Sequence, residues 1–330
     1  MGEEMCRRVA ALDLGSQTFR MVIAECAMDG EMGAPEITLR LRKNVRLSQG
    51  MGDDGMLSSH AVERAMAVLG EFGRVLTEAG VCSVRAVATE VLRRAADAER
   101  FIDMARKRTG IDIEVIPWQT EAALAAYGAV SSLPDLPRPV AMIDVGGGSS
   151  EVVLHDGCEV KGAVSIPMGA VGLWEQMGRP GCFDAEAIAQ LESAVLDRLS
   201  GVGLEDMGRA RSAIATGGTA TTAAAILHEM DEYDPSVVRG TPITISDMER
   251  MLREISSVPV ANRYAIKGLE PERADIFPAG LAILKGIAIT LGMDEIAVSD
   301  GGILLGVLLE LLEKECRTDA ELPSARGLYI

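Results

Sequence analysis

The residues best suited to chemistry lie in the stretch 140–151, which reads VAMIDVGGGSSE. Its apolar start predicts a buried strand, and that strand ends at Asp144. Glycine backbone can approach a ligand closely and turn its N–H groups toward one anion. Three glycines and a serine follow the strand in this way: Gly146, Gly147, Gly148 and Ser149. The turn is therefore a candidate phosphate-binding loop.

A carboxylate ends the same stretch, at Glu151. A carboxylate beside an anion-binding turn is electrostatically unfavourable unless a divalent cation lies between the two. The stretch therefore predicts Mg²⁺ (or Mn²⁺) held against a phosphate. For one such motif alone, a glycine-rich hairpin turn without a ligand is an equal alternative.

Two other segments repeat the pattern. An apolar strand over residues 7–14 contains Asp13, a strand returns over residues 19–25, and the turn between them is small and polar: Gly15, Ser16, Gln17 and Thr18. A third strand, over residues 213–216, leads into a helix whose start can present N–H groups to an anion: Gly217, Gly218 and Thr219. Two strand–Asp–Gly–Ser hairpins suggest a duplicated unit, and a coincidence of glycine turns is the alternative.

Two further side chains are candidates of a different kind. Arg93 lies one turn into a helix that follows a strand over residues 84–89, and from there it could bind an anion with two N–H groups. Pairing with Glu90 or Asp97 on the helix surface is as good an explanation. Glu121 lies in the first turn of another helix, where the helix dipole favours a carboxylate in any case. Taken alone, Glu121 is more often a helix-start acid than a catalytic one.

The composition limits the class of protein. The chain has 330 residues, 48% of them hydrophobic and 25% charged, which fits a soluble protein of two ordinary domains. No apolar run is long enough for a membrane helix, and the start of the chain lacks a secretory signal. Six scattered cysteines predict reduced thiols in the cytoplasm. The three histidines lie outside every motif, which argues against a zinc site or a histidine triad.

Charge and aromatic content argue against nucleic acid as a partner. The net charge is −17 and aromatic residues make up only 3% of the chain, so both electrostatic attraction and base stacking are lacking. The charge is uneven. Residues 1–130 carry 16 basic and 19 acidic side chains, whereas residues 131–330 carry 16 and 30. We therefore expect the N-terminal half to carry most of the anion-binding surface.

Ser58, Thr89 and Asp184 are predicted to begin and cap helices. Residues 272–291 are predicted to form a helix in which Ala279 and Gly280 allow close packing.

Strands and helices alternate along both halves, with glycine turns at the strand ends. This order predicts an α/β fold with a ligand in a cleft between two related lobes. The proline-rich stretch 131–139 is the best candidate for a linker. The expected lobes are residues 1–131 and 132–330. The last helix, about residues 303–315, is expected to pack back on the first lobe.

Eight segments together resemble the exopolyphosphatase/guanosine pentaphosphate phosphatase family, part of the actin–sugar kinase–Hsp70 superfamily. They occur in the family's order and cover nearly the whole chain: AALDLGSQTFRMV, KNVRL, ATEVLRRA, QTEAALAAYGAV, AMIDVGGGSSE, SIPMGAV, ATGGTATT and ERADIFPAG. The resemblance implies two duplicated domains of the actin-like ATPase, ribonuclease H-like type. It also implies a short, two-domain member of the family.

The resemblance also assigns roles to individual residues. Glu121 matches the family's catalytic carboxylate, which activates water, and Arg93 matches a phosphate-gripping arginine. Asp144 and Glu151 match the acids associated with Mg²⁺, and we expect Asp13 to join them. The phosphate-binding positions are the three turns: Gly15, Ser16, Gln17, Thr18, Gly146, Gly147, Gly148, Ser149, Gly217, Gly218 and Thr219.

Departures from the family pattern occur at two places. Gln17 stands where the family usually has asparagine, and Leu304 and Leu305 replace an arginine and a glutamate after the last glycine turn. The first change alters a hydrogen bond at the first loop, and the second removes the basis for assigning a role there.

The implied function is a metal-dependent phosphoanhydride hydrolase. Its substrate would be inorganic polyphosphate, guanosine pentaphosphate, or both. The alternatives are a kinase or ATPase of the same superfamily and a sensor that binds guanosine tetraphosphate or polyphosphate without hydrolysis. The sequence does not choose between the substrates, and it leaves the oligomeric state open, with a homodimer as one option. No membrane partner is expected.

Overall fold

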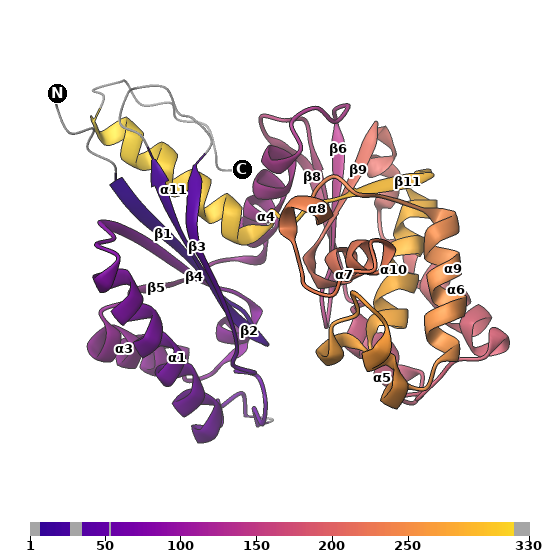
Figure 1. Cartoon of the computed structure of the whole chain (residues 1–330), viewed down its shortest axis with the longest axis horizontal. Coiled ribbons are helices and arrows are strands. Elements are labelled where there is room, and N and C mark those ends of the chain that lie inside the picture. Colours follow the sequence, from indigo (N-terminus) through magenta and orange to yellow (C-terminus); the bar gives the residue numbers. More distant parts are fainter. Residues whose placement is uncertain (1–6, 27–34, 53, 320–330) are drawn as a thin grey trace. The chain divides into compact units, whose positions relative to one another are not determined.

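The structure, a computed structural model, describes residues 7–26, 35–52 and 54–319 and divides into two compact units (Figure 1). Unit 1 contains the chain up to Leu124 and again from Ile303 onward, and unit 2 contains the chain from Ala125 to Gly302. The division falls inside a helix, a few residues before the stretch 131–139 that the sequence analysis treated as a linker. That stretch lies wholly within unit 2.

Unit 1 is built on one five-stranded sheet in the order β3-β2-β1-β4-β5. Its strands are β1 (Arg7–Leu14), β2 (Thr18–Cys26), β3 (Glu36–Asn44), β4 (Ser83–Ala88) and β5 (Ile113–Val115). Its helices are α1 (Ser59–Glu78), α2 (Glu90–Arg94), α3 (Ala98–Thr109), the start of α4 (Trp118–Ser132) and α11 (Ile303–Asp319).

The alternation of side chains along β1 explains how both faces of this sheet are covered. Ala10, Leu12 and Leu14 point to one face and join the core formed with α1 and α3. On the unit's last helix, Gly306 is packed so closely that a Cβ atom there would lie 1.9 Å from the Leu124 carbonyl oxygen. That helix, α11, packs against β1, β2 and β4, so a helix from late in the chain belongs to the first unit.

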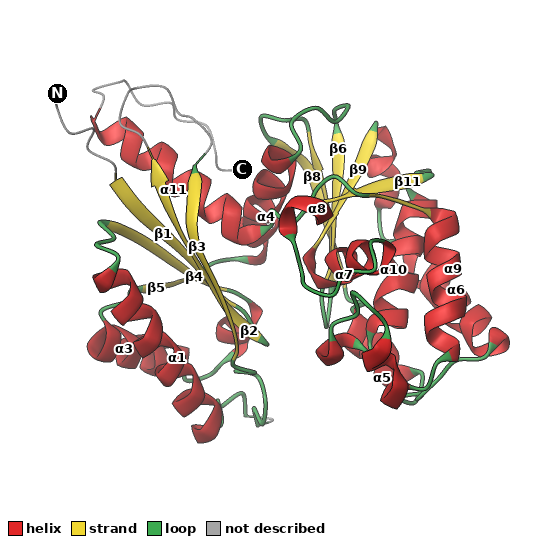
Figure 2. Ribbon diagram, viewed as in Figure 1, coloured by secondary structure: helices red, strands yellow, loops and turns green. Residues whose placement is uncertain are grey.

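Unit 2 contains a six-stranded sheet in the order β10-β11-β9-β6-β7-β8. Its strands are β6 (Val140–Val145), β7 (Ser150–His155), β8 (Val160–Ile166), β9 (Ser212–Thr216), β10 (Pro242–Thr244) and β11 (Glu295–Val298). Its α-helices are α5 (Ala170–Gln176), α6 (Ala185–Leu199), α7 (Gly217–Leu227), α8 (Pro235–Val238), α9 (Ile245–Ser257) and α10 (Phe277–Thr290), and its 3₁₀ helices are η1 (Leu204–Arg209), η2 (Val260–Ala265) and η3 (Pro271–Arg273). Figure 2 shows these helices and the loops that join them to the strands.

The central helix of unit 2 is α10, which packs against α5, α6, α7, α9 and β6. Two glycines permit the close approach. A Cβ atom on Gly280 would lie 2.6 Å from Thr219 Oγ1, and one on Gly286 would lie 2.4 Å from Val195 Cγ1. The predicted close packing at Gly280 is therefore confirmed. The helix begins at Phe277, later than the predicted residue 272, because Pro278 has no N–H group and fits only the first turn.

The two sheets repeat one topology. In unit 1, β1 pairs with β2 and β2 with β3 in antiparallel fashion, while β1–β4 and β4–β5 are parallel. In unit 2, β6–β7 and β7–β8 are antiparallel, while β6–β9 and β9–β11 are parallel. The predicted duplication is thus present strand for strand, with β10 added at the edge of the second sheet.

Helix starts follow the capping rules where the side chains permit it. Ser58 accepts a hydrogen bond from the Ala61 N–H at the start of α1, and Asp184 accepts one from the Ala187 N–H at the start of α6. Both caps are as predicted. The predicted cap at Thr89 is wrong, because its side chain makes no capping bond to α2. Within the described part of the chain, every helix is too short or too polar to cross a bilayer.

Candidate active site

The predicted metal-binding carboxylates of unit 2 are cross-strand neighbours. Asp144 of β6 is opposite Glu151 of β7 in the antiparallel register, and Glu151 is opposite Ser165 of β8. On the other side, Asp144 is in register with Thr216 of β9. Side chains that are opposite one another lie on the same face of a sheet. The four residues therefore form a row across the sheet, beside the predicted glycine turns.

Two hydroxyl groups hold the Glu151 carboxylate. Ser149 Oγ donates to Glu151 Oε1 at 2.7 Å, and Ser165 Oγ donates to the same oxygen at 3.0 Å. The next serine has a different task, since Ser150 Oγ is buried and donates to the Met168 carbonyl oxygen at 2.6 Å. The serines after the glycines thus orient an acid and fix the turn.

The glycine turn before β7 is closed by its own backbone. The N–H of Gly146 donates to the Ser149 carbonyl oxygen at 2.9 Å. This corrects the expectation that all three glycine N–H groups are available to an anion. Among the described residues, the N–H groups of Gly147 and Gly148 have no acceptor. These two glycines therefore retain the donors that a phosphate could use.

Helix α5 supports the turn from behind. The N–H of Ala170 donates to the Gly146 carbonyl oxygen, and the N–H of Val171 donates to that of Gly147, both at 2.9 Å. A Cβ atom on Gly169 would lie only 2.4 Å from the carbonyl carbon of Gly147, so a larger residue would push the turn away. The segment SIPMGAV, which carries part of the family resemblance, therefore supports the turn.

The third glycine turn lies against Asp144. Gly217 has φ of +80°, which favours glycine, and a Cβ atom there would lie 2.3 Å from Asp144 Oδ1. Thr219 follows in α7 and is buried. The structure therefore brings together predicted residues from two separate motifs of unit 2.

An arginine that sequence reasoning did not select lies over the same turn. A Cβ atom on Gly218 would be 1.8 Å from Arg273 Cζ, so the guanidinium group occupies the space above that glycine. Arg273 Nε donates to Glu270 Oε2 at 3.0 Å. The signal was present in the segment ERADIFPAG, but nothing local showed that its arginine returns to a turn more than 50 residues earlier.

The first loop, in unit 1, has the same backbone closure and different side chains. The N–H of Gly15 donates to the Thr18 carbonyl oxygen at 3.1 Å. Asp13 is almost buried, and Arg20 binds it twice, with Nε and Nη2 at 2.8 and 2.5 Å from Oδ2. Asp13 was predicted as a metal ligand, and the structure gives its charge a guanidinium partner.

Gln17 takes part in this loop through its backbone. Its carbonyl oxygen accepts the N–H groups of Val45 and Arg46 at 2.9 and 2.8 Å. Ser16 accepts the N–H of Ser48 in the same way, at 3.4 Å. The segment KNVRL therefore anchors the first loop through main-chain hydrogen bonds that do not depend on the departure from asparagine at residue 17.

The predicted catalytic pair is in contact. Arg93 Nη1 donates to Glu121 Oε2 at 2.7 Å and to the Ile116 carbonyl oxygen at 2.9 Å. Neither of the surface partners considered for Arg93, Glu90 or Asp97, is bound to it. In the described part of unit 1, Nε and Nη2 of Arg93 have no acceptor, so the guanidinium group still has donors for a phosphate.

The donor set of unit 2 suits a hard cation. Asp144 and Glu151 supply carboxylate oxygens, and Mg²⁺ is commonly held by one or two carboxylates together with water and substrate phosphates. Among the described residues, no three acidic, histidine or cysteine side chains are grouped so that they could hold a metal ion by themselves. The two-carboxylate arrangement therefore fits Mg²⁺ or Mn²⁺ bound together with a phosphate better than it fits a metal held by protein alone.

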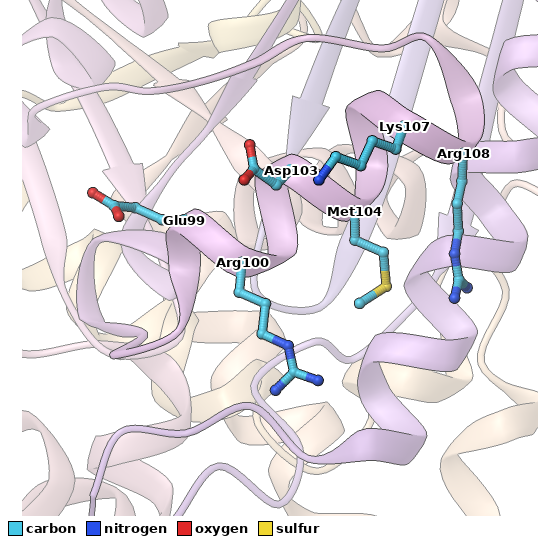
Figure 3. Close-up of a pocket in the computed structure, with 6 residues that line it drawn as sticks. All are labelled: Glu99, Arg100, Asp103, Met104, Lys107 and Arg108. Atoms are coloured by element: carbon cyan, nitrogen blue, oxygen red, sulfur yellow. The ribbon is translucent and has the colours of Figure 1, made fainter.

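A surface hollow of about 500 Å³ lies elsewhere, on α3 (Figure 3). Arg100, Met104 and Arg108 extend from one side of the helix, and Asp103 and Lys107 extend from another. None of the predicted site residues lines this hollow. It is wide open, which does not suit a pocket that must exclude water from a reacting phosphate.

Comparisons with known proteins identify the family of the chain. A family model described as the Ppx/GppA phosphatase family matches residues 25–315. The chain belongs to the Ppx/GppA phosphatase family. It is 29% identical to exopolyphosphatase 2 of Mycobacterium tuberculosis over 92% of this chain and 98% of that protein. It is 27% identical to the guanosine-5′-triphosphate,3′-diphosphate pyrophosphatase of Photobacterium profundum, over 92% of this chain and 59% of that protein.

A crystal structure of the Ppx/GppA family member of Aquifex aeolicus superposes with a TM-score of 0.82. The two chains are 28% identical, and the match covers 94% of this chain and 99% of that one. The predicted α/β fold with two duplicated units is therefore confirmed. The cleft between the lobes and the roles of single residues stay predictions.

Proposed function

We propose that this Ppx/GppA phosphatase is a metal-dependent phosphoanhydride hydrolase. It releases orthophosphate from the end of inorganic polyphosphate, or the 5′-γ-phosphate of guanosine pentaphosphate, or both. One observation carries the proposal. Asp144 and Glu151 are neighbours on one sheet face, beside a glycine turn in which the N–H groups of Gly147 and Gly148 have no acceptor among the described residues. The names of the mycobacterial and Photobacterium relatives supply the two substrate classes.

Asp144 and Glu151 would hold Mg²⁺ or Mn²⁺, which when bound neutralises phosphate charge and polarises the bond to be broken. The two serine hydroxyls on Glu151 would hold its carboxylate in place for the cation. Asp13 remains a proposed third acid, and its ion pair with Arg20 makes it the weakest of the three candidates for direct metal contact.

Glu121 would act as the general base that takes a proton from the attacking water. Arg93 Nη1 donates to Glu121 Oε2 at 2.7 Å and so orients the carboxylate of Glu121. The other N–H groups of Arg93 would be available to the phosphate that is transferred. Phosphoryl transfer needs an oriented nucleophile and neutralised charge rather than a covalent relay. Glu121 would orient the attacking water, and Arg93 would neutralise part of the phosphate charge.

The glycine turns would bind the remaining phosphate oxygens through backbone N–H and hydroxyl groups, with Arg273 as an added cation over Gly218. The proposal assigns the base to unit 1 and the metal to unit 2. It therefore requires that variants in either unit stop the same reaction.

The decisive experiment is phosphate release from polyphosphate and from guanosine pentaphosphate, with and without Mg²⁺, by wild type and Glu121→Gln. We expect release that requires Mg²⁺ and falls by at least ~10²-fold in the variant, the usual scale for losing a general base. Comparing kcat/KM for the two substrates identifies the preferred one.

Glu90→Gln is the matched control for this variant. Glu90 is also an acid in the first turn of a helix and also pairs with an arginine, Arg94 at 3.1 Å. We expect near-normal turnover from the control. Equal turnover by Glu121→Gln and Glu90→Gln would exclude Glu121 as the base.

A further inference from the structure

Ser165 belongs to the row across the second sheet and begins the segment SIPMGAV. It lies on β8, directly opposite Glu151 of β7, and is exposed at the surface of the unit. Its Oγ donates to Glu151 Oε1 at 3.0 Å. Ser165 therefore reaches a carboxylate of the proposed metal site from a different strand and from 14 residues further along the chain.

Glu151 is held from two directions. Ser149 approaches from the glycine turn and Ser165 from the neighbouring strand, and both donate to the same oxygen. A single hydrogen bond lets a glutamate side chain swing about the bonded atom, whereas two donors from separate backbone segments restrict that rotation. A metal-binding carboxylate is commonly fixed by hydrogen bonds of this kind.

The choice of residue at position 165 also calls for an explanation. An exposed position inside a strand favours threonine, valine or an aromatic residue over serine. Serine has a small side chain with one hydroxyl, and here that hydroxyl is within bonding distance of an acid. A residue type that does not suit the local secondary structure commonly marks a position that function requires.

We propose that Ser165 is a positioning residue for the metal site. It fixes the Glu151 carboxylate in the orientation that binds a divalent cation, acting together with Ser149. The inference rests on the proposed function to the extent that Glu151 is taken as a metal ligand. Ser165 itself contacts neither the substrate nor the reacting water.

The test is direct binding of Mn²⁺ to the full chain, measured by electron paramagnetic resonance or calorimetry with orthophosphate present, because the two-carboxylate site suits a cation that also binds phosphate. We expect Ser165→Ala to raise the Kd for Mn²⁺ about tenfold, the lower end of the range for residues that orient a ligand, because water can reach this exposed position. Ser165→Thr keeps the hydroxyl and should stay within about twofold of wild type.

Two further variants separate positioning from a general effect on the strand. Ser257→Ala removes an exposed serine hydroxyl that bonds only a backbone carbonyl, that of Glu254, and should leave the Kd unchanged. In a Glu151→Gln background, Ser165→Ala should add no further loss, because the two residues act as one unit. Thermal midpoints of all variants show whether each one is folded.

Unchanged Mn²⁺ affinity in folded Ser165→Ala would overturn the inference. So would an equal loss in Ser165→Thr, or a full additional loss in the Glu151→Gln background. The result is distinguishable from failure of the proposed function. If wild type releases phosphate and Glu121→Gln does not, the hydrolase proposal stands whatever Ser165 does. If wild type neither binds Mn²⁺ nor releases phosphate, both proposals fail.

Discussion

The hairpins β1–β2 and β6–β7 have the same backbone plan and different side chains. In each, an aspartate lies two residues before a glycine whose N–H donates to the carbonyl oxygen three residues later. In each, the aspartate is opposite the residue seven positions further on. That residue is Arg20 for Asp13, and it is Glu151 for Asp144.

The difference continues across both sheets. The row in unit 1 goes on from Arg20 to Arg42, and the row in unit 2 goes on from Glu151 to Ser165. One scaffold thus places guanidinium groups where the other places a carboxylate and a hydroxyl. The comparison shows how a duplicated fold can separate two tasks, with the second unit suited to a cation and the first to an anion.

The largest expected effect comes from neutralising the two equivalent aspartates, Asp13 and Asp144, in separate variants. Asp144→Asn should lower Mg²⁺-dependent phosphate release by ~10²–10³-fold, since a metal ion supplies several kcal/mol of charge stabilisation. Asp13→Asn should lower it far less, because that carboxylate is already neutralised by Arg20. The measurement is kcat at a series of Mg²⁺ concentrations. Equal losses would show that both units bind metal, as the sequence alone suggested.

Replacing Arg20 tests whether unit 1 binds an anion. Arg20→Met should raise KM for either substrate by about 10–100-fold, the worth of a charge-assisted hydrogen bond to phosphate, with a smaller change in kcat. It also leaves the nearly buried Asp13 without its partner, so the thermal midpoint should fall.

The double variant with Asp13→Asn provides the control. It should recover stability, because no unpaired carboxylate remains, but it should not recover KM. A KM restored along with stability would mean that Arg20 serves only the fold of unit 1.

The smallest expected effect concerns the contact between Gly217 and Asp144. Gly217→Ala should cost about 1 kcal/mol of stability, because alanine is strained at φ of +80°. It should also lower kcat about tenfold, because the new Cβ atom pushes against the Asp144 carboxylate.

Gly203→Ala is the matched variant in the same unit, with φ of +79° and open space around its Cβ position. Urea unfolding should show similar losses for Gly203→Ala and Gly217→Ala, while phosphate release falls only in Gly217→Ala. Loss of activity in both would show that backbone strain alone, rather than the Asp144 contact, explains the effect.

Much of the fold followed from local patterns. The strand over residues 7–14 was predicted to the residue, and the caps at Ser58 and Asp184 were predicted from side chains that compete for backbone N–H groups. The start of α10 was placed too early, at residue 272, although Pro278 fits only the first turn of a helix. Local patterns fail where a single residue such as proline overrides them.

The residues of the candidate site also differ in whether local patterns could identify them. Residue types and spacing were enough to select Asp144 and Glu151, which lie at strand ends beside a glycine turn. They did not select Glu121, whose catalytic role came only from the family resemblance. They could not select Arg273, whose guanidinium group lies over Gly218 only after the chain has folded back from η3. They also left Arg93 between a surface ion pair and a catalytic role, and tertiary structure decided that it binds Glu121.

Local sequence patterns were sufficient to predict most of the strands and helices, the duplication of the unit, and the acids that lie beside glycine turns. These depend on side-chain periodicity and on the conformational freedom of glycine, which are properties of short stretches. Only the tertiary structure decided the partner of each charge: Arg20 for Asp13, and the two serines for Glu151. Such pairings depend on strand register, and register is set by packing of residues far apart in the chain.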